Sequence, residues 1–357
     1  MYKNIVITGT GSFVPSIIKS NKEFSNHTFY TDEGKKITEP IERTITKFQK
    51  ITDIEERRYA SEDMTCSTLG FHAAEEAIAN AKINKEELDY IIVAHNFGDV
   101  IKHNIQSDMV PSIAARIKHK LKIANPNCVA YDVLFGCPGW IEGTIQASAF
   151  IKAGMAKKCL IIGTEALSRV LDPFDRDSMI FADGAGASVL EMKEEENQRG
   201  ILGHATQSHT LEEMEYLYLG KSNYPGSDDR IRYIKMKGRK IYEYALTNVP
   251  VAMKKCIDEA NVDVNKIKKV LIHQANHKMD EAIIDRFFKL SGSDQVPDKI
   301  MPMTIDKFGN SSVATIPTLY DLILRGEMKE HEIETDDHLL FASVGAGMNI
   351  NAFVYKQ

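Results

Sequence analysis

The sequence lacks several features that would place it in a common class of protein. Its five cysteines include no C-x-x-C pair, which argues against a zinc finger or a disulfide-stabilised scaffold. No run of about 18 uncharged apolar residues is present, so no membrane-spanning helix is expected. Positive charge is not in excess either, because 44 Lys and Arg residues oppose 50 Asp and Glu residues, and a net charge of −6 disfavours nucleic-acid binding. We therefore expect a cytoplasmic protein that binds neither nucleic acid nor a membrane.

What the sequence does contain is typical of a globular α/β protein. Its 357 residues are 43% hydrophobic and 26% charged, ordinary values for a chain long enough to bury a large core. Short apolar runs alternate with longer segments in which apolar residues recur at helical spacing, and the order strand, helix, strand indicates βαβ units. The predicted strands are residues 5–8, 90–94, 128–133, 159–162, 186–190, 270–272, 339–343 and 349–355, and the predicted helices are residues 64–81, 138–154, 239–261, 276–290 and 311–325.

A weak internal similarity suggests that the chain has two halves. Leu88–Asn96 and Ile267–Ala275 each place a polar turn containing histidine after an apolar strand. The charged stretch Lys193–Gly200 lies between these two segments. Because such a stretch is typical of a surface turn, it is a candidate boundary between the halves.

The segment VLFGCPGW, Val133–Trp140, is the first candidate for a catalytic role. It places Cys137 between a predicted strand and a predicted helix, with Pro138 in the first helical turn, where proline is tolerated. Unpaired backbone N–H groups and the positive end of the helix dipole favour a thiolate at such a position, so we predict a lowered pKa for Cys137. A buried apolar cysteine at a helix start is the alternative that this segment alone leaves open.

The segment VLIHQANH, Val270–His277, is the second candidate. Ligands of α/β sheets bind at the carboxyl ends of strands, so His273 and Asn276 are well placed for polar contacts. His273 and His277 are four residues apart, as zinc-protease ligands are. Gln274 stands where that motif requires glutamate, and no metal site is expected.

Two further turns follow nearer the carboxyl end of the chain. In KFGNSSVATIP, Lys307–Pro317, Asn310 lies just before a predicted helix with its amide available to donate, although a simple helix cap is the alternative. In SVGAGMN, Ser343–Asn349, small residues follow a predicted strand. The backbone N–H groups of such a turn can line an anion pocket.

Together, these segments resemble the β-ketoacyl-acyl carrier protein synthase III group of thiolase-fold condensing enzymes. The resemblance extends over nearly the whole chain, and HQAN, GN and a cysteine at a strand–helix turn form a specific combination. It implies an α/β fold of thiolase type with five layers, αβαβα, and two similar halves. We place these halves at residues 1–195, which carry the nucleophilic cysteine, and 196–357, which carry the histidine and asparagine. It also implies a homodimer.

The resemblance assigns roles to individual residues. The family's catalytic cysteine, histidine and asparagine match Cys137, His273 and Asn310. Cys137 would hold an acyl group as a thioester, and neutral His273 and the Asn310 amide would donate to the enolate formed when a malonyl thioester loses carbon dioxide. The backbone amides of Cys137 and Ala346 match the oxyanion hole, and Asn276 matches a residue that orders the active site. The implied activity is that of an acyltransferase in fatty acid or related acyl-chain biosynthesis, with acyl-coenzyme A or acyl carrier protein thioesters as substrates and no cofactor or metal.

Two departures from the family pattern concern the substrate. Members that load a primer from coenzyme A hold its nucleotide with a Trp and an Arg, and here Lys47 and Ile51 stand in those places, whereas Arg176 matches another nucleotide-contacting Arg. Delivery of the acyl chain on carrier protein therefore becomes more plausible. Val110 stands where relatives carry a bulky residue that closes the partner subunit's acyl pocket, which suggests an acyl group longer than acetyl.

An acyl carrier protein is acidic, so its docking surface should be basic. The candidates are Lys278 and Arg286, which follow the HQAN segment, and Arg239, which belongs to a second basic stretch, Arg230–Lys240.

Three alternative functions remain open at this point. The main one is a specialised ketosynthase that joins two β-ketoacyl thioesters to a dialkylresorcinol or cyclohexanedione type of product. A hydroxymethylglutaryl-coenzyme A synthase would use a glutamate as its acid–base, against which HQAN and the GN asparagine argue. A non-catalytic partner subunit would usually have lost the nucleophile, whereas Cys137 is present.

Overall fold

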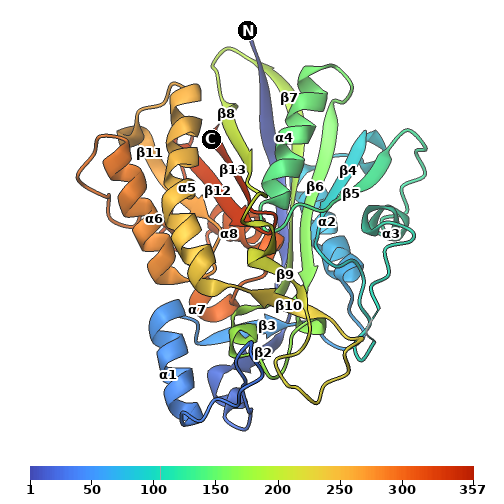
Figure 1. Cartoon of the computed structure of the whole chain (residues 1–357). Coiled ribbons are helices and arrows are strands. Elements are labelled where there is room, and N and C mark those ends of the chain that lie inside the picture. Colours follow the sequence, from blue (N-terminus) through green and yellow to red (C-terminus); the bar gives the residue numbers. More distant parts are fainter. Residues whose placement is uncertain (105) are drawn as a thin grey trace.

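Two β-sheets, each with helices on both faces, form the core of the protein (Figure 1). The computed structural model describes residues 1–104 and 106–357. In the first sheet β4 is parallel to β5 and β6, whereas β7 is antiparallel to β6 and β1. The strand order is β1 (Tyr2–Phe13), β7 (Asp183–Glu195), β6 (Lys158–Ala166), β4 (Tyr90–Ala94) and β5 (Val129–Val133).

The second sheet repeats most of this pattern. Its order is β8 (Gly200–Ser208), β13 (Asn349–Lys356), β12 (His338–Gly345) and β11 (Ile267–Ile272). From β8 the pairings are antiparallel, antiparallel and parallel, as they are from β1 through β7 and β6 to β4. The two segments with internal sequence similarity therefore form strands in equivalent places, β4 and β11. The proposed boundary at residues 195 and 196 lies between the end of β7 at Glu195 and the start of β8 at Gly200.

Helices complete a sandwich of five layers, αβαβα, which confirms the predicted fold class. The outer face of the first sheet packs against α2 (Cys66–Ala81) and α3 (Ile113–Lys120). Between the sheets lie α4 (Gly139–Lys152) and α8 (Thr315–Leu324), and the far face of the second sheet packs against α5 (Gly238–Glu259) and α6 (His277–Leu290). The central strands are apolar along nearly their whole length because both of their faces are covered.

Several smaller elements surround the carboxyl ends of the parallel strands, and the sequence did not predict them. They are β2 (Ile17–Ser20), β3 (Glu56–Tyr59), β9 (Leu217–Gly220), β10 (Tyr233–Met236), α1 (Ile41–Thr52) and α7 (Ile305–Phe308). The helix predicted for residues 311–325 begins later, because Ser312–Ala314 forms a 3₁₀ turn ahead of α8. In the part of the chain that the structure describes, no helix has the length and apolar character needed to cross a membrane.

Candidate active site

Cys137 lies in the turn between β5 and α4, against the turn that follows β12. Gly136 has a φ of 66°, in the left-handed region that favours glycine. A Cβ atom on Gly136 would lie 2.6 Å from Ala346 N, and one on Gly345 would lie 2.4 Å from Cys137 N. The two backbones can approach this closely only because both positions are glycine. The contact brings together the two residues whose N–H groups the sequence predicts as an oxyanion hole.

The thiol of Cys137 is less acidic than the sequence predicts. Burial raises its pKa to about 11, and the charge of Glu165 acts in the same direction, whereas a hydrogen bond from Ser312 lowers it. The prediction of a lowered pKa is therefore wrong for the substrate-free protein. The helix start is where it was predicted, but loss of hydration outweighs the helix dipole.

Asn310 is fixed in the turn between α7 and the 3₁₀ turn Ser312–Ala314. Its backbone donates to Ile180 O at 3.0 Å, and its carbonyl oxygen accepts from Ala182 N at 2.8 Å. Its side-chain Oδ1 accepts from Ser312 N at 2.7 Å, which leaves the Nδ2 group to donate elsewhere. Because Ser312 Oγ lies 3.3 Å from Cys137 Sγ, Ser312 links the predicted nucleophile to the predicted amide donor.

His273 immediately follows β11, and its backbone N–H donates to Ala342 O of β12 at 2.9 Å. This bond places His273 at the same edge of the sheet as Gly345, the last residue of β12. The side chain is 4% exposed, and burial lowers its pKa to about 4. Among the residues that the structure describes, Nδ1 has no hydrogen-bond partner. A neutral ring with an unpaired buried nitrogen is typical of a group that meets a ligand.

The remaining HQAN residues shape the turn that carries His273. Gln274 is buried, donates to Pro302 O at 3.0 Å and accepts from Thr304 N at 2.8 Å. Asn276 caps α6 by accepting from Met279 N at 3.1 Å. The predicted ordering role of Asn276 thus has a structural counterpart, a fixed start for the helix beside the site.

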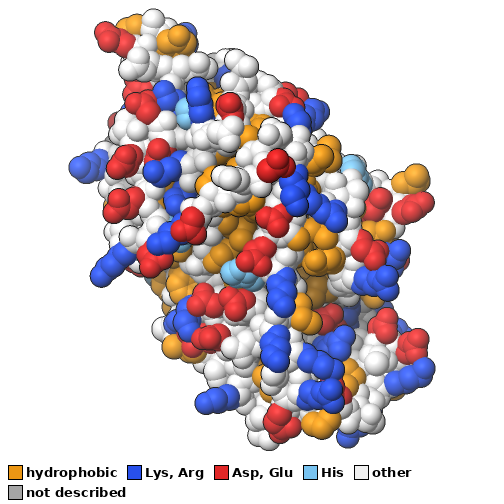
Figure 2. All heavy atoms as spheres, turned by 90° about the vertical axis from the view of Figure 1, so that its left-hand side faces the viewer, with side chains coloured by type: hydrophobic (Ala, Val, Ile, Leu, Met, Phe, Trp, Pro, Cys, Tyr) orange, Lys and Arg blue, Asp and Glu red, His pale blue; other side chains and the backbone are white. Residues whose placement is uncertain are grey.

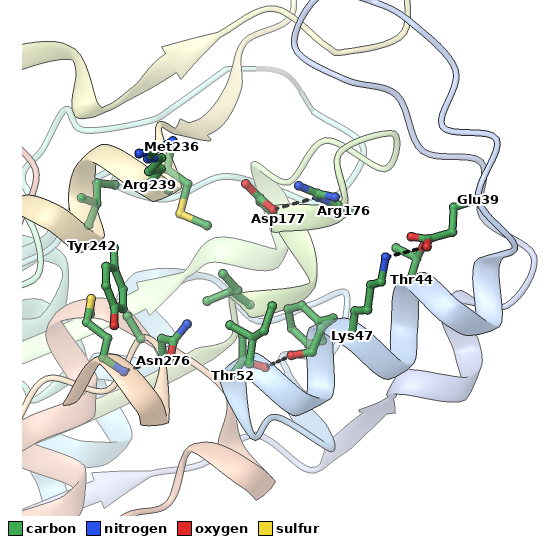
Figure 3. Close-up of a pocket in the computed structure, with 17 residues that line it drawn as sticks. Glu39, Thr44, Lys47, Thr52, Arg176, Asp177, Met236, Arg239, Tyr242 and Asn276 are labelled. Carbon is green, nitrogen blue, oxygen red and sulfur yellow. Dashed lines mark hydrogen bonds and ion pairs between the residues drawn. The ribbon is translucent and has the colours of Figure 1, made fainter. Parts of the chain in front are cut away.

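A large cavity of about 470 Å³ opens between α1, the start of α5 and the HQAN turn (Figure 3). Cations at its mouth are paired: Lys47 with Glu39 at 2.6 Å, and Arg176 with Asp177 at 3.6 Å. Its walls are otherwise largely apolar. The lining residues are Glu39, Thr44, Lys47, Phe48, Ile51, Thr52, Arg176, Asp177, Ile180, Met236, Gly238, Arg239, Ile241, Tyr242, Ala275, Asn276 and Met279.

A smaller cavity of about 200 Å³ lies directly against Cys137. The β9–β10 hairpin supplies its apolar wall. This contribution was not predicted, because both strands are short. Asn96 and Ser312 add polar groups, and neither was predicted. The only sequence signal for Asn96 was its position in a polar turn after β4. The lining residues are Asn96, Phe97, Gly136, Cys137, Phe181, Leu217, Tyr218, Leu219, Ile234, Ser312 and Ala346.

The other predicted residues lie outside these cavities or at their rim. Val110 is 88% exposed, on the segment between β4 and α3, so any contact with an acyl pocket would require a second subunit. Lys278 and Arg286 are exposed on α6, and Arg239 is exposed at the start of α5. Figure 2 turns to the viewer the side of the molecule that carries α5 and α6. That face carries both positive and negative side chains around an apolar hollow.

One member of the second basic stretch does not belong to a docking surface. Lys235 is buried and forms ion pairs with Asp172 and Asp175 at 2.5 and 2.8 Å. Counting it with the surface cations of that stretch was therefore wrong, because its ammonium group is already neutralised inside the protein.

Comparisons with known proteins agree with this geometry. Residues 131–210 match the family model described as 3-oxoacyl-[acyl-carrier-protein] synthase III, and residues 257–357 match its C-terminal counterpart. A β-ketoacyl-[acyl-carrier-protein] synthase III of Vibrio vulnificus is 33% identical over 350 residues, which cover 97% of each chain. A solved 3-oxoacyl-[acyl-carrier-protein] synthase III of Aquifex aeolicus superposes with a TM-score of 0.78 over 100% of both chains at 28% identity. The enzyme of Thermus thermophilus gives the same TM-score over 99% of both chains at 30% identity.

Proposed function

Because the chain belongs to the β-ketoacyl-[acyl-carrier-protein] synthase III family and is therefore a condensing acyltransferase, we propose that Cys137 carries the acyl group. The group is then joined to a malonyl thioester by decarboxylative Claisen condensation. The observation that carries the residue assignment is the packing of two turns against one thiol, with a third turn at the end of the neighbouring strand. Gly345 packs on Cys137, Ser312 joins Cys137 to Asn310, and neutral His273 follows the neighbouring strand β11.

The first step transfers the acyl group to the enzyme. Cys137 Sγ forms a bond to the carbonyl carbon of the acyl thioester as the bond to the original sulfur breaks, and the thiol proton leaves with the departing thiol. The N–H groups of Cys137 and Ala346 would donate to the thioester oxygen while it carries negative charge. Loss of one such donor typically costs about 3 kcal/mol of transition-state stabilisation.

The second step forms the carbon–carbon bond. The malonyl thioester loses carbon dioxide, and the electron pair of the broken bond becomes an enolate whose oxygen accepts from His273 and from Asn310 Nδ2. The enolate carbon attacks the acyl carbon on Cys137, whose sulfur leaves and takes a proton from solvent. Burial keeps His273 neutral at pH 7. The neutral ring carries one N–H group, which can donate to the enolate oxygen.

The two cavities provide separate binding sites for the acyl chain and for the arm of its carrier. The 200 Å³ cavity beside Cys137 is larger than an acetyl group requires, and we assign it to the acyl chain. The 470 Å³ cavity would take the arm of a carrier. Lys47 and Arg176 are paired with carboxylates at its mouth, so holding the phosphates of coenzyme A would require these exposed pairs to break, at a cost of up to about 1 kcal/mol each. This pairing favours acyl groups delivered on carrier protein.

The proposed carrier-protein docking surface, homodimer and cytoplasmic location rest on the sequence and on the exposure of single residues. Lys278, Arg286 and Arg239 are exposed and would contact the acidic carrier protein. A homodimer would bring the exposed Val110 of one subunit to the acyl cavity of the other. A cytoplasmic location agrees with five free thiols, and we expect the reaction to require neither a metal nor a cofactor.

The test is product formation from defined thioesters. The wild-type protein should convert an acyl thioester and malonyl-carrier protein into carbon dioxide and a 3-oxoacyl-carrier protein, and Cys137→Ala should form no product. Equal product formation by both proteins would contradict the proposal. Because the paired cations and small Val110 also favour the specialised ketosynthase, a β-ketoacyl thioester should replace malonyl-carrier protein in a parallel reaction. A cyclised product there would identify that second candidate.

A further inference from the structure

Ser312 contacts the proposed nucleophile and one of its proposed partners at the same time. Its Oγ lies 3.3 Å from Cys137 Sγ, and its backbone N–H donates to Asn310 Oδ1 at 2.7 Å. The residue is 4% exposed and has a φ of 54°, in the left-handed region. That conformation is unfavourable for serine and persists where the surrounding structure fixes it, often at functional sites.

The direction of the hydrogen bonds around the Ser312 hydroxyl follows from its neighbour Asn96. Asn96 Nδ2 donates to Ser312 Oγ at 3.1 Å, and the same nitrogen also donates to Glu165 Oε1. An amide nitrogen has two hydrogens, so both are used. Since Ser312 Oγ accepts from Asn96, its single proton is left to point at Cys137 Sγ.

Glu165 completes this chain of hydrogen bonds by accepting from Asn96. It lies in β6 and is buried. Burial raises its pKa well above the usual range, which favours the neutral acid over the carboxylate. In its neutral form Glu165 fixes the Asn96 amide without the repulsion that the carboxylate exerts on a thiolate at Cys137.

We propose that Ser312 is a further catalytic residue, which donates a hydrogen bond to the Cys137 sulfur and stabilises the thiolate as it attacks. Asn96 is the positioning residue that directs the hydroxyl, and Glu165 holds Asn96. The inference rests on the proposed role of Cys137 as the acyl carrier. A hydrogen bond to the sulfur matters at this site because burial raises the pKa of the thiol to about 11, and the bond from Ser312 opposes that shift.

The experiment measures how fast iodoacetamide alkylates Cys137 between pH 6 and pH 10. Among the titratable groups around the thiol, the charge of Glu165 of β6 acts on its pKa, and Tyr218 of β9 lines the same cavity. His273 follows β11 at the same edge of the second sheet as Gly345. Ser312→Gly is the main variant, because glycine adopts a φ of 54° without strain and keeps the N–H that holds Asn310. Its alkylation rate at pH 8 should fall about tenfold, and the rise of its rate with pH should be displaced by about one unit toward higher pH, since a hydrogen bond to a charged group is lost.

A second variant and a matched control make the result specific. Asn96→Asp is nearly isosteric but accepts where the amide donated, so it should draw the Ser312 proton away and slow alkylation to a similar extent. Ser311→Ala is the control, because the Ser311 hydroxyl lies 3.4 Å from Thr315 Oγ1 instead, and its rate should equal that of the wild type.

The outcomes separate this inference from the proposed condensation, because alkylation needs no acyl substrate. Unchanged rates and pH profiles in both Ser312→Gly and Asn96→Asp would overturn the inference, as would equal slowing in Ser311→Ala. Slowing in Ser312→Gly alone would overturn the role given to Asn96.

Discussion

Lys235 Nζ lies 2.5 Å from Asp172 Oδ2, and the two side chains are only 6% and 0% exposed. The ammonium group also donates to Asp175 and to Asn223 Oδ1, both at 2.8 Å. Lys235 belongs to β10, whose Ile234 lines the cavity beside Cys137 and whose Met236 lines the larger one. This buried ion cluster therefore fixes the strand that borders both substrate cavities.

Replacing Lys235 should destabilise the whole protein. Lys235→Met keeps the volume but leaves two buried carboxylates unpaired, and removal of one partner from a buried ion pair typically costs 3–5 kcal/mol, so we expect the free energy of unfolding to fall by about 4 kcal/mol. Chemical denaturation measures this change. Lys240→Met, at an exposed lysine of α5, is the matched control and should change it by less than about 0.5 kcal/mol. Equal effects of the two variants would contradict the structural role of the cluster.

Charge reversal on the proposed docking face should weaken the use of carrier-bound substrate. Lys278→Glu combined with Arg239→Glu should raise KM for malonyl-carrier protein roughly tenfold, because each exposed charge contributes up to about 1 kcal/mol. The effect should shrink as salt is added.

The controls for this prediction separate docking from catalysis. A neutral N-acetylcysteamine thioester should show an unchanged KM with the double variant. Lys120→Glu, on α3 at the opposite side of the molecule (Figure 1), should leave both substrates unaffected. A similar loss with the neutral thioester would show that the charges act on the active site and not on the carrier.

Burial of His273 should make part of the protein's stability depend on pH. The pKa of the folded state is about 4, below the ordinary value of 6.5, so between these values the unfolded chain binds a proton that the folded chain does not. Stability therefore falls as the pH falls through this window. His273→Gln lacks this effect, and the stability advantage of the wild type over the variant should shrink by about 2 kcal/mol between pH 7.5 and pH 5. A difference that stays constant with pH would show that His273 titrates alike in both states.

Asn310→Asp should separate the two half-reactions. The backbone N–H of Ser312 would still hold one side-chain oxygen, but the donor is lost and a negative charge faces the enolate. Decarboxylation of malonyl thioester should fall about a hundredfold or more, while acylation of Cys137 persists. Asn127→Asp, at an exposed position, should change neither rate. Loss of acylation together with decarboxylation would contradict the assignment of Asn310 to the second step.

Much of the fold could be predicted because its central strands are buried on both faces. The run Tyr90–Ala94 has the predicted bounds of β4, since continuous apolar residues end sharply at polar ones. In contrast, β8 was missed because it carries polar residues such as His204 and Gln207 at the edge of its sheet. The helix α1 was missed because its apolar residues do not face the main core: Phe48 packs on a small separate cluster and, with Ile51, lines a cavity.

The candidate site, like the fold, could be predicted from the sequence only in part. Cys137, His273 and Asn310 could be selected because each lies in a short motif at a turn. Asn96 and Ser312 could not, since their importance depends on a chain of hydrogen bonds between segments far apart in sequence. The direction of the Cys137 pKa shift was also beyond the sequence, which indicates where a helix starts but not how completely the packed turns exclude water.

The most direct test of the central assignment is the intact mass of the protein after exposure to acyl donors alone. The wild type and Cys137→Ala would each be incubated with a panel of acyl-coenzyme A and acyl-carrier protein thioesters and then denatured in acid. The wild type should gain the mass of one acyl group, located on Cys137 by peptide mapping, and the variant should gain none. An adduct that persists in Cys137→Ala, or condensation product without any adduct on the wild type, would contradict the account.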